Sequence, residues 1–436
     1  MESEVYIILL ASVTDGRPTL RIMGQDQAKA SAAKQHVENF MAQLDAKFFE
    51  VEALHICLVE TGDRVWLYNY RNRPNDPPGV GIKLRGIEAE NRTAILDQSM
   101  IDAFVDDQML ALMKHRIGRS LDAIRHQKKT FSMNVHLGVF ILTGAIREDR
   151  ILYSHEEFIK LMENAGGDVE TFVTDSLTEA DNFLAPVGQV SGDLATVKPI
   201  FRGKFVLENK FKPGRYYLLQ VEFTINEEGD VVRLSAKWSR FEAGQTLPTQ
   251  YLDVNLIDLL DGRAWHFALE GTISVAQHNL PIHMRTFADL VMINKQLASV
   301  IRTDQPFMKW STFKSIKVKQ VRLERVFVYQ IRNTGFLVEA SHVMIGGLGC
   351  CWSIDVHHSE WPMHLAQLEK LAPGRAATWG QVMPLFFPDD GLTCYTTLVD
   401  PAGEDDPAPS AGLRLLVNKL ICLTNIIQGR VLAMDD

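Results

Sequence analysis

Residues 5–24 of the chain read VYIILLASVTDGRPTLRIMG, and this stretch predicts two short β-strands joined by a turn. The apolar run Val5 to Leu10 is typical of a strand, Asp15-Gly16 is a turn signal, and Thr19 to Met23 is the second strand. Gly24 then precedes apolar residues at helical spacing: Ala30, Ala33, Val37, Phe40, Met41 and Leu44. The chain therefore starts with the order strand, turn, strand, helix.

The strand pair recurs after this helix. Leu54 to Glu60 and Arg64 to Tyr70 are predicted strands around the turn signal Thr61-Gly62-Asp63. A long helical pattern follows from about Asp97 to Lys128, and Phe131 to Thr143 is the next predicted strand. This part of the chain is therefore a mixture of helices and strands.

A capping box marks the last predicted helix of this first part. In Ser154-His155-Glu156-Glu157 the serine hydroxyl accepts from an amide three residues on, while Glu157 reaches back to the serine amide. The segment Glu179 to Pro199, with two prolines and two glycines, is the predicted connection to a second domain. We therefore expect one domain at 1–185 and another at 198–436.

From about Lys198 to Pro388 the sequence favours β-structure. The predicted strands are Tyr216–Thr224, Val231–Phe241, Tyr251–Leu256, Trp265–Val275, Ile316–Ile331 and Phe336–Ile345. Helices are predicted around Phe287–Val300 and Met363–Leu371, and an acidic loop at 400–412 precedes a final apolar helix at 413–427. The predicted fold class is α+β, with a large antiparallel, sandwich-like second domain closed by that helix.

The bulk composition limits the class of protein. The net charge is −9 and the sequence pI about 5.8, so any nucleic-acid binding must rest on a local patch. The five cysteines have no zinc spacing and indicate free thiols in a reducing compartment. The first residues lack a secretory signal pattern, and no run approaches the roughly 20 apolar residues of a membrane span. We expect a cytoplasmic or nuclear protein without a membrane partner.

The strand–strand–helix order resembles the second half of a KH-type RNA-binding module. Residues 19–24, the alanine-rich helix and residues 131–140 (FSMNVHLGVF) together resemble a family of uncharacterised fungal proteins, in which KH-like segments precede a domain of unknown function. The resemblance is best over residues 5–165 and implies association with RNA, but no catalytic residues. The GxxG loop with which KH modules clamp nucleic acid is missing from both units.

The strand after Arg64 carries the first candidate RNA contact. Strand alternation places Trp66, Tyr68 and Tyr70 on one face and Val65 and Leu67 on the other. If the aliphatic face is buried, the aromatic face is a stacking platform, with basic residues following at Arg71 and Arg73. The alternative is that the aromatic residues themselves form the core face.

The basic end of the long helix is the second candidate contact. Its residues Arg119, Arg125, Lys128 and Lys129 would track phosphate groups of RNA. The alternative is a solvated helix whose acidic start and basic end match the helix dipole. A third basic run, from Lys314 to Arg325, changes phase near Gln320 and is interpreted as an exposed strand with a bulge.

Motifs for catalysis, cofactors and metals are missing from the sequence. Gly79-Val80-Gly81 starts like a dinucleotide fingerprint, but Leu84 occupies the place of the third glycine. A metal alternative combines Cys350, Cys351, His357, His358 and His364. Adjacent strand residues point to opposite faces, so buried thiols and edge histidines are the favoured interpretation. We expect no enzyme activity, no cofactor and no metal.

The terminal helix is apolar on nearly every side and either packs in its own core or binds a partner. The residues of a partner-binding surface would be Leu416, Leu420, Leu423 and Ile427. The function predicted from the sequence is a non-enzymatic adaptor or assembly protein of an RNA-associated complex, with single-stranded RNA bound by the aromatic and basic residues. The alternative is a protein–protein scaffold with degenerate KH-like units and no RNA contact.

Overall fold

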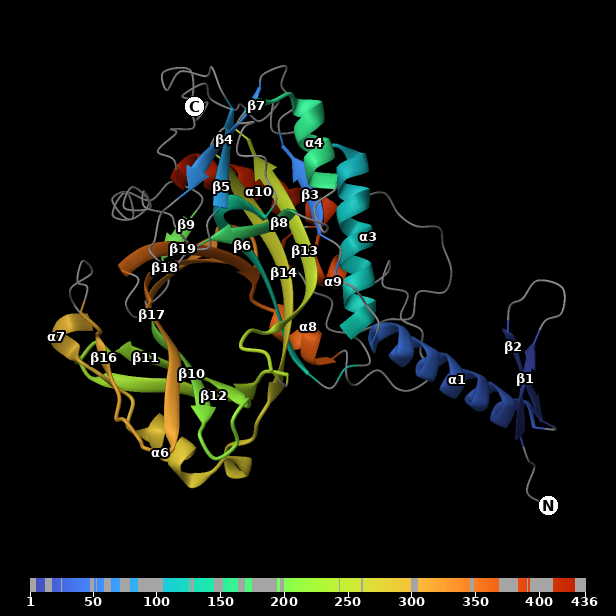
Figure 1. The fold of residues 1–436 in the computed structure, drawn as a ribbon, viewed down its shortest axis with the longest axis horizontal. Coiled ribbons are helices and arrows are strands. Elements are labelled where there is room, and N and C mark those ends of the chain that lie inside the picture. Colours follow the sequence, from blue (N-terminus) through green and yellow to red (C-terminus); the bar gives the residue numbers. More distant parts are fainter. Residues whose placement is uncertain are drawn as a thin grey trace.

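A closed β-barrel is the centre of the protein. The computed structural model describes residues 5–11, 18–24, 26–47, 51, 53–58, 64–70, 79–84, 105–124, 127, 129–144, 152–163, 169–174, 194–196, 200–242, 244–259, 262–298, 305–345, 349–367, 383–389, 391–392 and 411–427. Within these residues one sheet holds fifteen strands, and eight of them close on themselves (Figure 1).

All eight barrel strands pair antiparallel with their neighbours. In order around the barrel they are β14 (Arg263–Ser274), β12 (Val231–Arg240), β11 (Tyr216–Ile225), β10 (Ile200–Asn209), β17 (Ile316–Ile331), β18 (Phe336–Ile345), β19 (Gly349–His358) and β6 (Thr130–Gly144). Strand β6 pairs with β14 and thereby closes the barrel.

The predicted fold class, a KH-like αβ region followed by a separate sandwich, is wrong. Strand β6 comes from the predicted first region, yet it lies between β19 and β14 of the predicted second one. The apolar pattern of residues 130–144 predicts a strand with a buried face. It does not reveal which distant strand completes its ladder, because pairing partners are set by tertiary context.

The rest of the sheet extends from β6 and β14. Strand β13 (Thr249–Asp258) pairs with β14, and β3 (Leu54–Cys57) runs parallel to β13. The remaining strands of this sheet are β5 (Gly79–Leu84), β4 (Val65–Tyr70), β7 (Leu152–Tyr153), β8 (Val169–Thr174) and β9 (Leu194–Thr196). A separate short pair joins β15 (Met292–Ile293) to β16 (Met308–Lys309).

The predicted N-terminal order of elements is confirmed. Strands β1 (Val5–Ala11) and β2 (Pro18–Gly24) form an antiparallel hairpin, and helix α1 (Gln27–Lys47) follows. The Asp26 carboxylate accepts from the Ala28 amide at 2.9 Å and so caps the helix. In Figure 1 this hairpin lies apart from the barrel, at the far end of α1.

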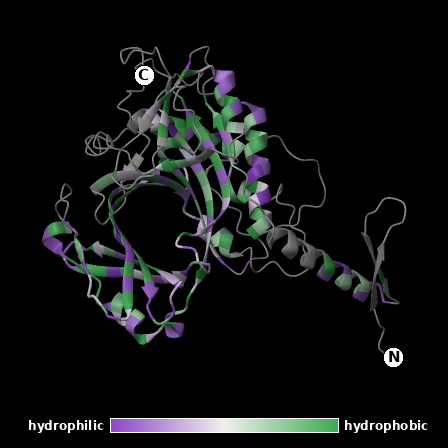
Figure 2. Ribbon diagram, in the orientation of Figure 1, coloured by the Kyte–Doolittle hydropathy of each residue, from purple (hydrophilic) through white to green (hydrophobic). Residues whose placement is uncertain are grey.

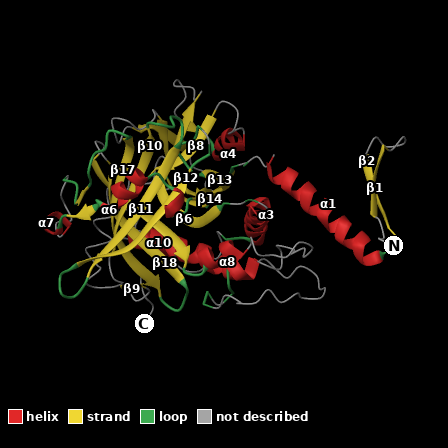
Figure 3. Cartoon of the chain, turned by 90° about the horizontal axis from the view of Figure 1, so that it is seen from below, coloured by secondary structure: helices red, strands yellow, loops and turns green. Residues whose placement is uncertain are grey.

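Helices cover the outside of the barrel and bury its apolar faces. The largest core cluster joins α3 (Asp107–Ile124), α8 (Trp361–Gln367), α9 (Met383–Phe386) and α10 (Ala411–Ile427) to the sheet. A second cluster lies under α6 (Ile282–Asp289) and α7 (Lys295–Ala298), beside the 3-10 turn η3 (Gln277–Asn279). A third lies under α4 (His155–Glu163). Figure 3 shows α3 alongside the strands, on the side of α1.

Several predicted local features are confirmed. At the start of α4 the Ser154 amide donates to Glu157 at 2.9 Å, and the Glu157 amide donates to the Ser154 hydroxyl at 3.2 Å. Separately from these predictions, Gly262, in the turn before β14, has a φ of +67°, the left-handed region that favours glycine. The β10–β17 register shifts where Val206 faces Gln320 and Leu207 faces Val318, which is the predicted bulge. Among the described helices, none has the length and apolarity needed to cross a membrane.

Candidate functional site

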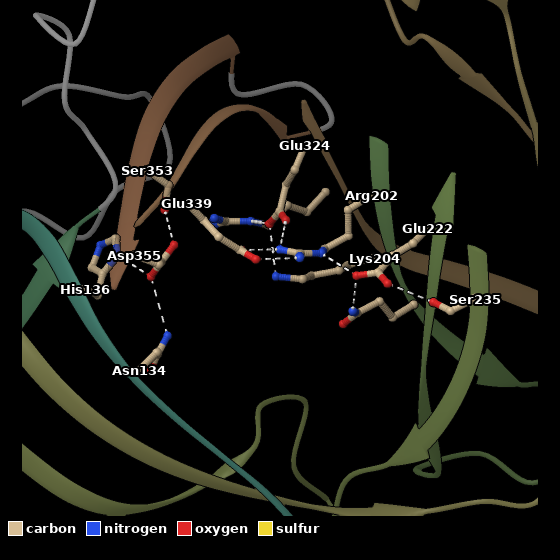
Figure 4. Close-up of polar contacts among 12 residues, drawn as sticks. Asn134, His136, Arg202, Lys204, Glu222, Ser235, Glu324, Glu339, Ser353 and Asp355 are labelled. Atoms are coloured by element: carbon tan, nitrogen blue, oxygen red, sulfur yellow. Dashed lines mark hydrogen bonds and ion pairs between the residues drawn. The ribbon is translucent and has the colours of Figure 1, made fainter. Parts of the chain in front are cut away.

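Strand β10 shows why charged side chains gather inside the barrel. Phe205 and Leu207 belong to the second core cluster, which lies outside the barrel under α6 and α7. There the Phe205 ring contacts Phe287 of α6, with 5.6 Å between the ring centroids. Because successive strand residues point to opposite faces, Arg202 and Lys204 point into the barrel (Figure 4). Figure 2 shows the same mixture of hydrophilic and hydrophobic residues along the other barrel strands.

Arg202 is the centre of the interior network. Its guanidinium contacts Glu339 through both terminal nitrogens, at 2.8 Å and 3.0 Å, and donates from Nε to Glu222 at 2.9 Å (Figure 4). Burial alone would lower the pKa of Arg202, but the carboxylates of Glu339, Glu324 and Glu222 outweigh it and raise the pKa. The planar fork of arginine suits such a two-point contact with a carboxylate.

Glu324 is the most deeply buried acid of the network. One of its oxygens accepts from Lys204 at 3.0 Å and from Arg322 at 2.5 Å, and the other lies 3.3 Å from Arg202. Burial alone would raise the pKa of Glu324, but Lys204, Arg322 and Arg202 outweigh it and hold the pKa well below its usual range. Glu324 therefore stays ionised between three cations.

Solvent reaches the cations of this network although they lie inside a closed barrel. The exposed fraction of the side chain is 32% for Lys204 and 22% for Arg322, against 2% for Glu324. A barrel of eight strands has room for its own side chains or for one small ligand. The interior is thus a polar space with ion pairs on its wall.

The opposite wall of the barrel carries a second polar group, on β6 and β19. Asp355 accepts from Ser353 at 3.0 Å and lies 3.0 Å from Nδ1 of His136 (Figure 4). His136 faces His266 across the β6–β14 ladder, and Nε2 of His266 lies 3.3 Å from Asp253. A histidine–aspartate contact therefore recurs beside this wall, between β14 and its neighbour β13.

Two acids on the strands beside this wall, Glu270 of β14 and Asp253 of β13, differ in their proton affinity. Burial raises the pKa of Glu270 and outweighs the nearby Lys204, which acts in the opposite direction. Burial would also raise the pKa of Asp253, but the contact with His266 outweighs it and lowers the pKa. The His266 contact thus favours the ionised form of Asp253, whereas Glu270 holds its proton more tightly.

The predicted aromatic platform is partly described. Val65 and Leu67 are buried in the core under α4, so the aromatic face of β4 points away from that core. Trp66 is 39% exposed, and its ring lies 5.7 Å from the ring of Tyr68, which packs on Gly81. The Tyr70 side chain lies outside the described residues, as do Arg71 and Arg73. Binding of RNA at this face stays a prediction.

The predicted basic contacts at the end of α3 are spread over different environments. Arg119 is exposed on the helix, whereas Arg125 and Lys128 lie outside the described residues. Lys129 is 11% exposed and contacts Tyr251 at 2.6 Å and Glu242 at 2.5 Å. Lys129 is therefore engaged with its own chain, and a role of these residues in phosphate contact stays a prediction.

The predicted partner-binding residues of the last helix lie in the core. Leu416, Leu420 and Leu423 of α10 are buried in the cluster that joins the helix to the sheet, and the Ile427 side chain lies outside the described residues. The burial of these three leucines favours the self-packing alternative, and binding of a partner by this helix stays a prediction. Among the described residues no group of three histidine, cysteine or acidic side chains forms a metal site.

The interior network was not predicted from the sequence. Its signal is a charge at every second position: Arg202 and Lys204 on β10, and Arg322 and Glu324 on β17. A strand at a protein surface shows the same alternation, and the run containing Arg322 was interpreted in that way. Only the closure of the sheet turns this face inward.

The comparisons with known proteins place the chain in a family. A family model described as a domain of unknown function (DUF7905) matches residues 103–345. This agrees with the predicted domain of unknown function and does not test the KH-like label or the fungal origin. No curated protein matches the chain.

Solved structures with distant similarity to the chain include the following three. The S. pombe Pct1 RNA triphosphatase has a TM-score of 0.35 at 10% identity, over 65% of this chain and 90% of that one. Its complex with the Spt5 CTD has a TM-score of 0.34 at 11% identity, over 65% and 91%. The PH1819 protein of Pyrococcus horikoshii OT3 has a TM-score of 0.20 at 12% identity, over 44% and 81%. Similarity this weak carries no information about activity. Any inference about function must therefore come from the residues of the barrel itself.

Proposed function

The chain belongs to the family that shares the domain of unknown function DUF7905, and from its barrel interior we propose that it is a non-catalytic binding protein for a small phosphate-bearing molecule. The observation that carries this proposal is the solvent access of Lys204 and Arg322 inside the barrel. Stability alone does not account for such a network, because replacing buried ion pairs by apolar residues is often neutral or stabilising.

The charges of the network fit a phosphate ligand. The guanidinium groups of Arg202 and Arg322 and the ammonium of Lys204 are the donors that proteins use for phosphate oxygens. Glu222 and Glu339 face the same guanidinium. Mg²⁺ that accompanies phosphates usually takes one or two carboxylates of the protein, and these two acids would supply them.

The protonation of these groups favours binding over proton transfer. A general acid or base works best with a pKa near the working pH. Around Arg202 the pKa of Glu222 is lowered despite its burial, and that of Glu324 even more, whereas that of Arg202 is raised. These side chains keep their charges near neutral pH, as binding groups do.

Calorimetry with inorganic tripolyphosphate tests the proposal on the full chain. We expect saturable binding that strengthens with Mg²⁺, and at least tenfold weaker binding in Lys204→Ala and in Arg322→Gln. Lys212→Ala is the matched control, since Lys212 is exposed in the turn after β10. Thermal unfolding checks that each variant is folded.

Three results would contradict this function. They are a wild-type chain that does not bind tripolyphosphate with or without Mg²⁺, variants of Lys204 and Arg322 that bind as tightly as the wild type, and citrate binding that matches tripolyphosphate. Release of phosphate from tripolyphosphate by the wild type at a higher rate than by Lys204→Ala would contradict the proposal that the protein is non-catalytic.

The exposed face of β4 favours a second function, the binding of single-stranded RNA. Trp66 and Tyr68 lie together on that face while Val65 and Leu67 are buried behind it. A base stacked on an aromatic ring contributes about 1–3 kcal/mol. This function extends the prediction of an RNA-associated adaptor, and it leaves the barrel interior free.

Filter binding of an oligouridine at low salt tests this second function. We expect Trp66→Ala to weaken binding at least fivefold, since the stacking surface is lost. Phe211→Ala is the control, because Phe211 is an aromatic residue even more exposed than Trp66, at 74% against 39%, but lies in the turn after β10. Equal affinity of both variants and the wild type would rule out stacking at β4.

A further inference from the structure

Strand β12 closes the barrel with only a small part of its length. On one side it pairs with β11 from Val231 to Arg240. On the other side it pairs with β14 only at Ser239 and Arg240. Next to this pair, the Val275 amide donates a hydrogen bond to the Trp238 carbonyl at 2.9 Å. Among the described residues, no strand pairs with Val231–Lys237 on that side, and we call this segment the β12 edge.

The β12 edge is apolar, basic and accessible. Val232 and Leu234 are 42% and 52% exposed, and Lys237 is exposed beside them. Unpaired edges add further strands, and proteins usually protect them with proline, with covering elements or with short strands. The sequence VVRLSAKWSR of β12 contains no proline and no acid, but three basic residues.

The edge is also held in its strand conformation. The Arg233 guanidinium donates to the carbonyls of Ala288 and Val291, at 2.9 Å and 2.8 Å, and so ties β12 to the end of α6. An edge that is ordered in advance costs less entropy when a partner binds. Added strands gain main-chain hydrogen bonds and then select side chains at alternate positions.

We propose that the β12 edge binds an extended, acidic segment of a partner protein by strand addition. The charges along β12 indicate which kind of segment would bind at this edge. A second copy of the chain, added antiparallel, would place the basic residues of one β12 beside those of the other, and like charges in facing positions destabilise a strand pair. A segment that alternates acidic and apolar residues can instead place an acid beside Lys237 and, on its other face, an apolar residue beside Leu234.

Ala236 lies at the centre of this edge. The Trp238 carbonyl points toward β14, because it accepts from Val275. Backbone groups of alternate residues point to the same side of an antiparallel strand, so the Ala236 amide points to the edge as well. A proline at Ala236 removes that donor, and proline is tolerated in an edge strand when its nitrogen faces outward.

The test measures binding of a fluorescein-labelled nine-residue peptide that alternates Glu and Val to the full chain, by fluorescence anisotropy. We expect saturable binding, at least tenfold weaker in Ala236→Pro and at least threefold weaker in Lys237→Glu. Lys212→Glu, outside the edge, should bind as the wild type does. A peptide that alternates Lys and Val should bind at least tenfold more weakly. Hydrogen exchange of the wild type should slow at Val231–Lys237 when the acidic peptide is added.

Four outcomes overturn the proposal. They are no saturable binding of the acidic peptide, folded edge variants that bind it as the wild type does, equal binding of the lysine peptide, and a dimer of the wild type that Ala236→Pro dissociates. The last result would assign the edge to a second copy of the chain. Thermal unfolding and hydrogen exchange of each variant without peptide confirm that a loss of binding is not a loss of fold.

Discussion

Glu324 shows how single residues keep the barrel interior folded. Its carboxylate is buried between Lys204, Arg322 and Arg202, so its charge offsets three cations at once. Removing one partner of a buried ion pair costs about 3–5 kcal/mol, because a charge is left uncompensated. We expect Glu324→Gln to lower the free energy of unfolding by about 3 kcal/mol or more, measured by urea unfolding. Glu156→Gln, at an exposed i,i+4 pair with Lys160, is the control and should cause no measurable change. An unchanged stability of Glu324→Gln would mean that the network does not support the fold.

The same carboxylate predicts a dependence of stability on pH. The pKa of Glu324 is lower in the folded chain than its ordinary value of 4.5, so its contribution to stability is present above pH 4.5 and is lost as the pH falls toward the folded pKa. Glu270, whose pKa is raised by burial, contributes with the opposite sign. The difference in unfolding free energy between the wild type and Glu324→Gln isolates the Glu324 part. We expect this difference to shrink between pH 5 and pH 3, and a difference that stays constant over this range would contradict the charge pairing.

At the scale of elements, the start of α4 tests whether a capping signal in the sequence also contributes to the stability of the helix. Ser154 and Glu157 exchange two hydrogen bonds with each other's backbone amides. Losing a serine cap costs about 1 kcal/mol. We expect Ser154→Ala to destabilise the helix by about that amount and to speed hydrogen exchange at the Glu157 amide. Ser154→Asp keeps a capping oxygen and should restore slow exchange; equally slow exchange in Ser154→Ala would show that the cap is not needed.

Helix α10 belongs to the core, and its leucines should behave as core residues. Leu420 is fully buried in the cluster that contains α3 and the sheet. Truncation of a buried leucine to alanine costs about 2–5 kcal/mol. We expect Leu420→Ala to lose about that much unfolding free energy and Lys419→Ala, one residue earlier and less buried, to lose far less. Similar losses in the two variants would mean that the helix is docked only loosely.

The elements differ in how far the sequence predicted them, and the reason is physical. Strands β17 and β18 have the predicted bounds, Ile316–Ile331 and Phe336–Ile345, because apolar alternation and the Asn333-Thr334-Gly335 turn are local signals. Strand β10 was missed, although it carries Arg202 and Lys204. A charged strand face has the same pattern whether it meets solvent or the inside of a barrel. The closure that distinguishes the two depends on pairs distant in sequence, such as Val135 with Phe267.

At the scale of the whole molecule, β6 joins the two regions that the sequence predicts as separate domains, 1–185 and 198–436. It pairs with β14 and β19 of the barrel and with β5 and β8 beyond it. The charged interior depends on this strand as well, because His136 lies on β6 and contacts Asp355 of β19. The barrel therefore includes residues from both sides of the predicted connection at 179–199.

This joint role of β6 predicts how the chain behaves when it is divided. A fragment of residues 198–436 lacks β6, so β14 and β19 lose a shared neighbour and expose unpaired edges. We expect this fragment to lack the cooperative unfolding transition of the full chain in urea, followed by circular dichroism, and to regain it when residues 1–185 are added. A chain that starts at residue 53 is the matched control: it lacks the β1–β2 hairpin and α1, which form no strand pair with the barrel among the described residues. It should keep the main transition. If residues 198–436 alone unfold as cooperatively as the full chain, then β6 is an addition to the barrel and does not hold it closed.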